Sequence, residues 1–166
     1  MTNRARYVLV FCCAVSAGIH AALTPDHFGE RVAAGIGFAA SAVVLAALAV
    51  ALARRPSPLL VDAAIVVLVG LIGAYVLAVT TGVPVLSPES EPVETLAVVT
   101  KVIEVIGITA GLVLRIAAVR PLRSIPVIPV ALVIAISALV TVPVAPAHHG
   151  DHADHEHPGE HEHHHE

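Results

Sequence analysis

The sequence is poor in the residues that cover the surface of a soluble protein. Only 13% of its 166 residues are charged, whereas 57% are hydrophobic, and the mean hydropathy is +0.86. A soluble domain of this length cannot bury so much apolar surface, because its area is too large for its volume. The composition therefore excludes an ordinary soluble domain and indicates that the lipid bilayer is the solvent of this chain.

Aromatic residues are also scarce. There are three Phe, two Tyr and no Trp, so the aromatic belt that many membrane proteins carry at the interface is nearly missing. No basic surface interleaved with aromatic residues occurs either, and we expect no nucleic-acid partner.

Motifs of enzyme sites are absent from the sequence. It contains no glycine-rich phosphate loop, no nucleophile elbow, and no H-E-x-x-H, C-x-x-C or C-x-x-C-H motif. The only cysteines, Cys12 and Cys13, are adjacent, and neighbouring cysteines rarely form an unstrained disulfide. Successive helical positions also point about 100° apart, so the two thiols do not converge on one ligand. We expect two small buried hydrophobic residues, and we expect that the protein is not an enzyme.

What the chain does contain is a series of long apolar runs between proline-rich breaks. Thr24-Pro25-Asp26 and Ser57-Pro58 are typical helix starts, because the hydroxyl can accept from free amides and proline suits the first turn. Arg54-Arg55-Pro56 ends the run before it. The expected helices are residues 7–23, 25–53, 58–80, 92–120 and 124–142, each long enough to cross ~30 Å of hydrocarbon. The sequence predicts an all-α integral membrane protein, with a bundle of five transmembrane helices in residues 1–146.

The first run follows a short basic start and extends over seventeen residues from Tyr7 to Leu23. It resembles a signal peptide, and Val15-Ser16-Ala17 is an acceptable cleavage site. The run continues past that site, however, so we expect an uncleaved first helix.

The basic residues predict the orientation in the membrane. They gather at alternate ends of the predicted helices, while the opposite ends are acidic, with Arg31 as their only base. The positive-inside rule then places the N-terminus in the cytoplasm and the C-terminus outside a bacterial inner membrane. The residues behind this prediction are Arg4, Arg6, Arg54, Arg55, Arg115, Arg120 and Arg123 on one side, and Asp26, Glu30, Glu89, Glu91 and Glu94 on the other.

The last twenty residues, 147–166, differ in kind from the rest. From residue 148 onward there are nine His and six acidic residues in nineteen, with no base. Such a segment cannot form a core, and we expect a disordered tail whose imidazoles and carboxylates bind divalent transition metal ions. The alternative is a solvating acidic tail. The candidate ligands are His148, His149, His152, His155, His157, His161, His163, His164 and His165.

A second group of candidate metal ligands lies at the expected outer corner between the first two helices. His20 precedes the predicted turn, and His27 and Glu30 follow it three residues apart on one helix face. With Glu94 as a fourth ligand, these residues suit Zn²⁺, Cu²⁺ or Ni²⁺. The ordinary alternative is a capped helix start with histidines wetted at the headgroup level.

Two pairs of charges fall within the predicted spans. Glu104 lies near the middle of its helix and Lys101 is three residues earlier, so the two can pair. Charged groups at that depth indicate either function or a neutral pair that holds the helix in place. Asp62 and Arg115 lie at similar depth on successive helices, which predicts a structural ion pair.

The hairpin I-H-A-A-L-T-P-D-H-F-G-E, the following long helix that ends in Arg-Arg-Pro, and the later G-V-P-V-L-S-P-E-S-E-P-V-E-T-L segment resemble an uncharacterised family of small multi-pass membrane proteins of actinobacteria. The resemblance covers roughly residues 7–120 and implies no activity. It does imply that His20, His27, Glu30 and Glu104 belong to a recurrent pattern. The His-rich tail stands outside it as an addition.

Two functions follow from these features. The first is a metal-handling membrane protein, in which the external tail collects copper or zinc near the outer site. The alternative is a non-catalytic subunit or assembly factor of a membrane complex, or a homo-oligomer, in which Lys101 and Glu104 face the partner. A transporter is a weaker third reading, because five helices without an inverted repeat leave little room for a path.

Overall fold

The computed structural model describes residues 2–81, 93–117 and 127–141. Within these ranges the chain is all-α. Its five helices are α1 (Thr2–Glu30), α2 (Val32–Arg54), α3 (Pro58–Thr80), α4 (Thr95–Ile116) and α5 (Val127–Thr141).

Four of these helices, α1 to α4, are long and apolar enough to cross a membrane. The described α5 has 15 residues, or roughly 22 Å at 1.5 Å per residue, which is shorter than the hydrocarbon core. By helix length and hydropathy this is a multi-pass membrane protein, with four candidate spans among the described residues rather than the five that were expected.

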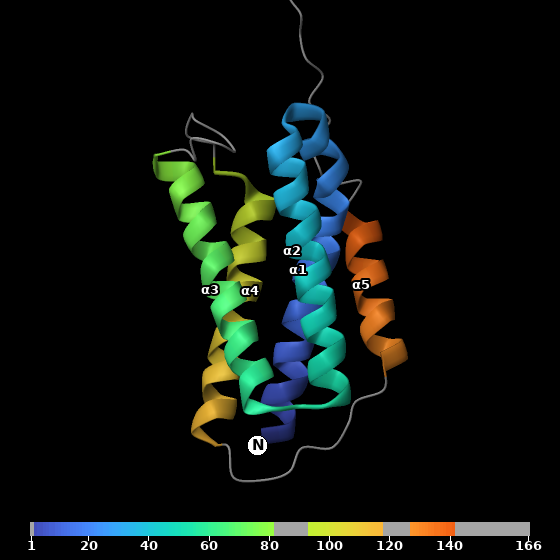
Figure 1. Ribbon diagram of the computed structural model, residues 1–166, viewed down its shortest axis with the longest axis vertical. Helices are drawn as coiled ribbons and strands as arrows, with labels where there is room; N and C mark the ends of the chain where they lie inside the picture. Colours follow the sequence, from blue (N-terminus) through green and yellow to red (C-terminus); the bar gives the residue numbers. More distant parts are fainter. Residues whose placement is uncertain (1, 82–92, 118–126, 142–166) are drawn as a thin grey trace, which may run out of the picture.

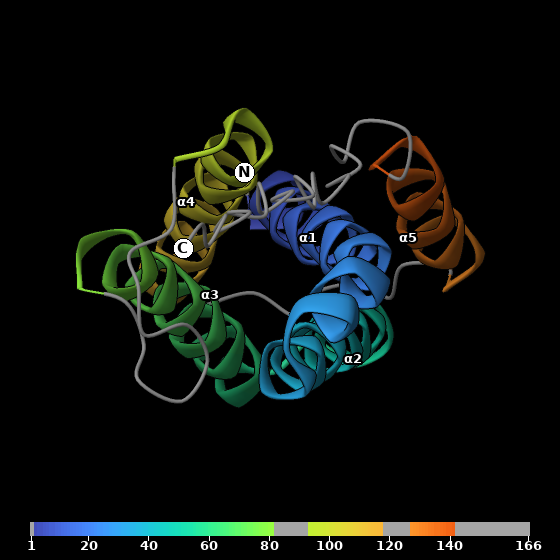
Figure 2. The ribbon, with the colours of Figure 1, turned by 90° about the horizontal axis from the view of Figure 1, so that it is seen from above.

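The helices form a bundle in which successive helices run in opposite directions (Figure 1). Seen from above, α1 lies between α4, α2 and α5 (Figure 2). It packs against all three, whereas α3 packs mainly against α4. The middle of α1 therefore meets protein on several sides, and most of its positions from Leu9 to His20 are buried.

The predicted turn at Thr24-Pro25 is wrong. α1 continues to Glu30 with Pro25 inside it, and the Thr24 hydroxyl donates to the His20 carbonyl at 2.8 Å instead of capping a new helix. Inside α1, Pro25 has no N–H to donate to the Ala21 carbonyl and its ring crowds that carbonyl, although its fixed φ is helical. The chain turns at Arg31, whose extended backbone (φ −152°, ψ 126°) separates α1 from α2.

The other helix starts follow their local signals. α3 begins at Pro58, where the Ser57 hydroxyl accepts from the Leu60 amide at 3.3 Å. α4 begins at Thr95, three residues later than expected, after Glu94 in an extended conformation. The tail and the segment 82–92 lie outside the described residues, so the predicted division of the chain at residue 146 stays a prediction.

The core forms where the small and branched residues of α1 meet the other helices. Cys12 and Cys13 are both buried free thiols. The core also includes Leu9, Val10, Ala14 and Ala17 of α1, Leu45, Leu48, Ala49 and Leu52 of α2, Val61, Ala64 and Leu68 of α3, and Ala110 and Leu114 of α4.

Two glycines permit close approach of helices. A Cβ at Gly18 of α1 would lie 2.5 Å from the Ile134 carbonyl oxygen of α5, so no larger residue fits there without moving backbone. A Cβ at Gly107 would lie 3.0 Å from the Cys12 side chain. By contrast, Gly70 and Gly73 of α3 are exposed and have open space where a Cβ would stand.

Candidate functional site

A chain of polar side chains connects α1 and α4 inside the bundle. Glu104 is 0% exposed. The Ser16 hydroxyl donates to its Oε1 at 3.1 Å, and Lys101 Nζ donates to its Oε2 at 2.7 Å. Both carboxylate oxygens therefore have a donor, which is what burial of a charge requires. Glu104 is nine residues into the 22 of α4, so its predicted mid-helix depth agrees with the structure.

The pattern of α4 explains why Glu104 faces inward. Its buried residues recur mostly every three or four positions and form one stripe, while most of the intervening Val and Ile residues are exposed. Glu104 occupies the same stripe as the small residues that contact α1. The stripe consists of Thr100, Glu104, Gly107, Ala110, Gly111 and Leu114.

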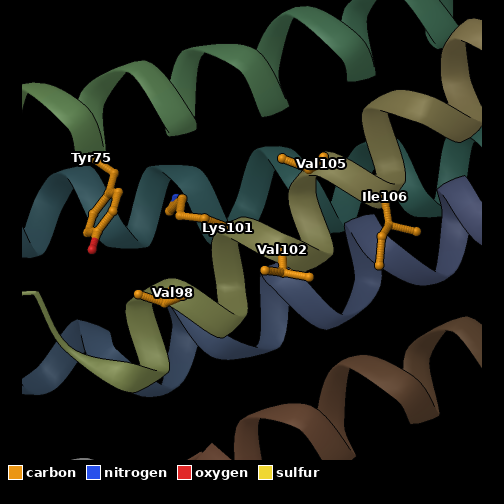
Figure 3. A pocket seen from close by; sticks show the side chains of 6 residues that line it. All are labelled: Tyr75, Val98, Lys101, Val102, Val105 and Ile106. Carbon is orange, nitrogen blue, oxygen red and sulfur yellow. The ribbon is translucent and has the colours of Figure 1, made fainter.

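Lys101 connects the same carboxylate to α3. Its ammonium lies 3.4 Å from the Leu71 carbonyl oxygen and 5.6 Å from the centre of the Tyr75 ring. Figure 3 shows Tyr75 and Lys101 beside an open groove of about 290 Å³, with apolar α4 residues along it. The Tyr75 hydroxyl is buried and has no hydrogen-bond partner among the described residues.

Both histidines of α1 are held in the same way. His20 Nδ1 lies 2.8 Å from the Ser16 carbonyl oxygen, and His27 Nδ1 lies 2.9 Å from the Leu23 carbonyl oxygen. A carbonyl oxygen only accepts, so Nδ1 carries the proton in each ring and Nε2 carries the lone pair. Neither Nε2 has a hydrogen-bond partner in the part of the chain that is described.

Phe38 of α2 contacts both imidazoles. Its ring centre lies 3.7 Å from that of His27, in a stacked arrangement, and 5.4 Å from that of His20. His20 is buried at 7% exposure, and it also connects to the Glu104 network, because the Ser16 hydroxyl lies 3.4 Å from its Nδ1. The polar chain thus begins near the end of α1 and reaches the middle of α4.

The predicted four-ligand corner does not assemble. Because α1 runs through Thr24, His20 and His27 lie on one helix, seven residues and roughly 10 Å apart along its axis. Glu30 and Glu94 are exposed. In residues 2–81, 93–117 and 127–141 no three His, Cys, Asp or Glu side chains form a group that could hold a metal ion. His148 to His165 lie outside these ranges.

The pair Asp62–Arg115 lies at the opposite end of the bundle. Arg115 Nε is 2.6 Å from Asp62 Oδ1, and the side chains are 43% and 45% exposed. This half-exposed contact joins α3 to α4, and its structural role stays a prediction.

Two buried polar residues have roles that the sequence analysis did not assign. Ser16 is the link between His20 and Glu104, and its only sequence signal is the four-residue spacing to His20. Arg6 is 2% exposed, and it donates to the Leu52 and Ala53 carbonyl oxygens at 3.1 and 2.9 Å. It therefore caps the end of α2, whereas the sequence indicated only a basic residue outside the span.

Comparisons of the chain with protein family models, with curated proteins and with solved structures gave no match. The family expected from the hairpin motifs is therefore not identified. The fold is that of a small multi-helix protein with four candidate membrane spans.

Proposed function

We propose that this membrane protein handles a divalent transition metal ion, copper or zinc, at the end of the bundle where α1 turns into α2. The observation that carries the proposal is the state of the two histidines. In both, a backbone carbonyl holds Nδ1–H and leaves the Nε2 lone pair available, which is the arrangement found in metal-ligating histidines.

Each histidine supplies one ligand in this proposal, and the described residues add no third His, Cys, Asp or Glu side chain to them. The remaining ligands come from the tail, whose nine His and six acidic residues offer many overlapping sites. α5 runs in the same direction as α1 (Figure 1), so the two helices end on the same side of the bundle.

The Glu104 network acts in this proposal as the support for His20. Glu104 holds the Ser16 hydroxyl, and the Ser16 carbonyl holds the imidazole. Partners behind a ligand fix its orientation and raise its basicity. We further propose that this end of the bundle faces outward from the cytoplasmic membrane, because Arg54, Arg55 and Arg115 lie at the other end.

Elemental analysis tests the proposal on protein purified without nickel resin. We expect copper or zinc on the full-length chain, less metal on a chain that ends at residue 147, and a further loss in His20→Ala or His27→Ala of the shortened chain. Asp26→Asn, an exposed polar change beside His27, is the matched control. If the shortened chain takes up no metal, the helices have no part in binding.

The pH dependence separates tail binding from nonspecific association. Protonation of imidazole competes with the metal, so binding to the full-length chain should weaken below about pH 6. A titration of bound metal between pH 5 and pH 8 would contradict the proposal if the affinity stayed constant.

A second candidate is a non-catalytic subunit or assembly factor of a membrane complex. It is favoured by the Tyr75 hydroxyl, which is buried without a partner in the described residues beside the groove of Figure 3. If the hydroxyl turned toward the groove, a carbonyl or hydroxyl group of a partner helix at this level would satisfy it. Co-purification in mild detergent tests this role: Tyr75→Phe should weaken the association, and a lone monomer from native membrane would rule the role out.

A further inference from the structure

A second groove lies along α2 at the end of the bundle where the chain begins. It has a volume of about 870 Å³ and is open to the outside of the bundle. Its wall is made of small apolar side chains of α2, and α3 contributes Leu60. The lining residues are Ala46, Ala47, Val50, Ala51, Arg54, Arg55 and Leu60.

The arginines at the end of this groove have no side-chain partner in the part of the chain that the structure describes. The last carbonyls of α2, those of Leu52 and Ala53, are already bound by Arg6. Asp62, the described acidic residue at this end, is bound by Arg115. Arg54 and Arg55 are exposed, and their side chains make no ion pair or hydrogen bond with any described residue.

The shape of the groove fits an extended apolar chain, such as a hydrocarbon chain, that lies parallel to the axis of α2. Ala46 and Arg54 are eight residues apart, so the apolar wall is roughly 12 Å long. In a membrane, the part of the groove around Ala46 and Ala47 faces hydrocarbon. The arginines at the end of the helix lie at the level of the headgroups. The surface therefore combines an apolar slot in the hydrocarbon with two guanidinium groups where lipid phosphates are found.

We propose that this groove binds an anionic phospholipid, with the phosphate between Arg54 and Arg55 and an acyl chain along Ala47 and Ala51. Guanidinium groups bind phosphate oxygens through paired hydrogen bonds, and basic pockets between membrane helices select anionic headgroups. The occupant is a lipid rather than a free anion, because most of the lining is apolar.

Native mass spectrometry of the full-length protein in detergent tests the proposal. We expect bound phosphatidylglycerol to survive gradual activation, and phosphatidylcholine with the same acyl chains to dissociate earlier. Millimolar inorganic phosphate should not displace the anionic lipid. Equal retention of both lipids, or displacement by phosphate, would overturn the assignment.

Charge variants separate this site from general attraction to basic residues. Arg54→Gln/Arg55→Gln should lower the affinity for phosphatidylglycerol about 30-fold, since one basic residue near an anionic surface contributes a factor of about five. The control Arg4→Gln/Arg31→Gln removes the same charge from two exposed arginines outside the groove. An equal loss in the control would show that only net charge matters.

A steric variant tests the acyl slot without changing charge. Ala47 and Val43 are both exposed on α2, but only Ala47 lines the groove. Ala47→Phe should weaken phosphatidylglycerol binding several-fold, while Val43→Phe should leave it unchanged. No effect of Ala47→Phe would exclude a chain in the slot, and thermal unfolding of both variants in detergent checks that each one is folded.

Discussion

The two ion pairs that occur among the described residues have nearly the same length and very different surroundings. Lys101 Nζ and Glu104 Oε2 are 2.7 Å apart with side-chain exposures of 17% and 0%, while Arg115 and Asp62 are 2.6 Å apart and more than two-fifths exposed. Water screens the attraction between exposed charges, and holding their two side chains in one geometry costs conformational entropy. A buried charge loses its hydration, so each partner depends on the other. Burial, and not the distance, decides what each pair contributes.

The largest effect is expected from breaking the buried pair. Glu104→Ala leaves the Lys101 ammonium and the Ser16 hydroxyl without their carboxylate, and should lower the free energy of unfolding by about 3–5 kcal/mol. Helical circular dichroism during denaturation in detergent micelles measures this loss.

The control for that variant removes both charges. Lys101→Met/Glu104→Leu fills similar volume without leaving a charge, so it should recover most of the lost stability. If the double variant is as unstable as Glu104→Ala, the charges are not the cause.

A smaller effect is expected from Ser16→Ala. It removes one of the two donors to Glu104, and a buried acceptor without its donor costs about 1–3 kcal/mol. Ser41→Ala is the matched control, because the Ser41 hydroxyl bonds only the Gly37 carbonyl of its own helix. Equal losses in the same denaturation experiment would show that the contact with Glu104 contributes nothing.

The smallest effect is expected from Asp62→Asn. An exposed pair contributes about 0–1 kcal/mol, and salt reduces that contribution further. Denaturation at low and at high salt measures the loss of unfolding free energy and its dependence on salt. Arg115→Gln, which removes the other partner of the pair, should give a similar loss. If the free energy of unfolding fell by more than about 2 kcal/mol and the loss did not change with salt, this pair would behave like the buried pair Lys101–Glu104.

The fold was predictable where one signal dominates. Long apolar runs define the helices, and the depth of Glu104 followed from counting along α4. The pairing with Lys101 followed from their three-residue spacing. The expected turn at Thr24-Pro25 failed because a hydroxyl before a proline fits two situations: it can cap a new helix, or it can bond the carbonyl four residues back inside an existing one. Only the contact of α1 with its neighbours decides between them.

The candidate site was predicted less well, because its geometry also depends on contacts between helices. The four-ligand corner depended on the position of the turn, so it was lost when α1 continued to Glu30. Ser16 and Arg6 gained their roles from helices far away in the sequence, at Glu104 and at Leu52 and Ala53. The neighbouring sequence of a serine in an apolar run does not show whether its hydroxyl bonds a carboxylate on another helix or a carbonyl of its own helix.

The central position of α1 bears on how the chain matures in the cell. Cleavage after Ala17, where the sequence resembles a signal-peptidase site, would remove Leu9 and Cys13 from the core together with the Ser16 donor to Glu104. It would also remove Arg6 from the end of α2. The described bundle contains residues 2–17 as part of its central helix, so a chain cleaved after Ala17 could not form it.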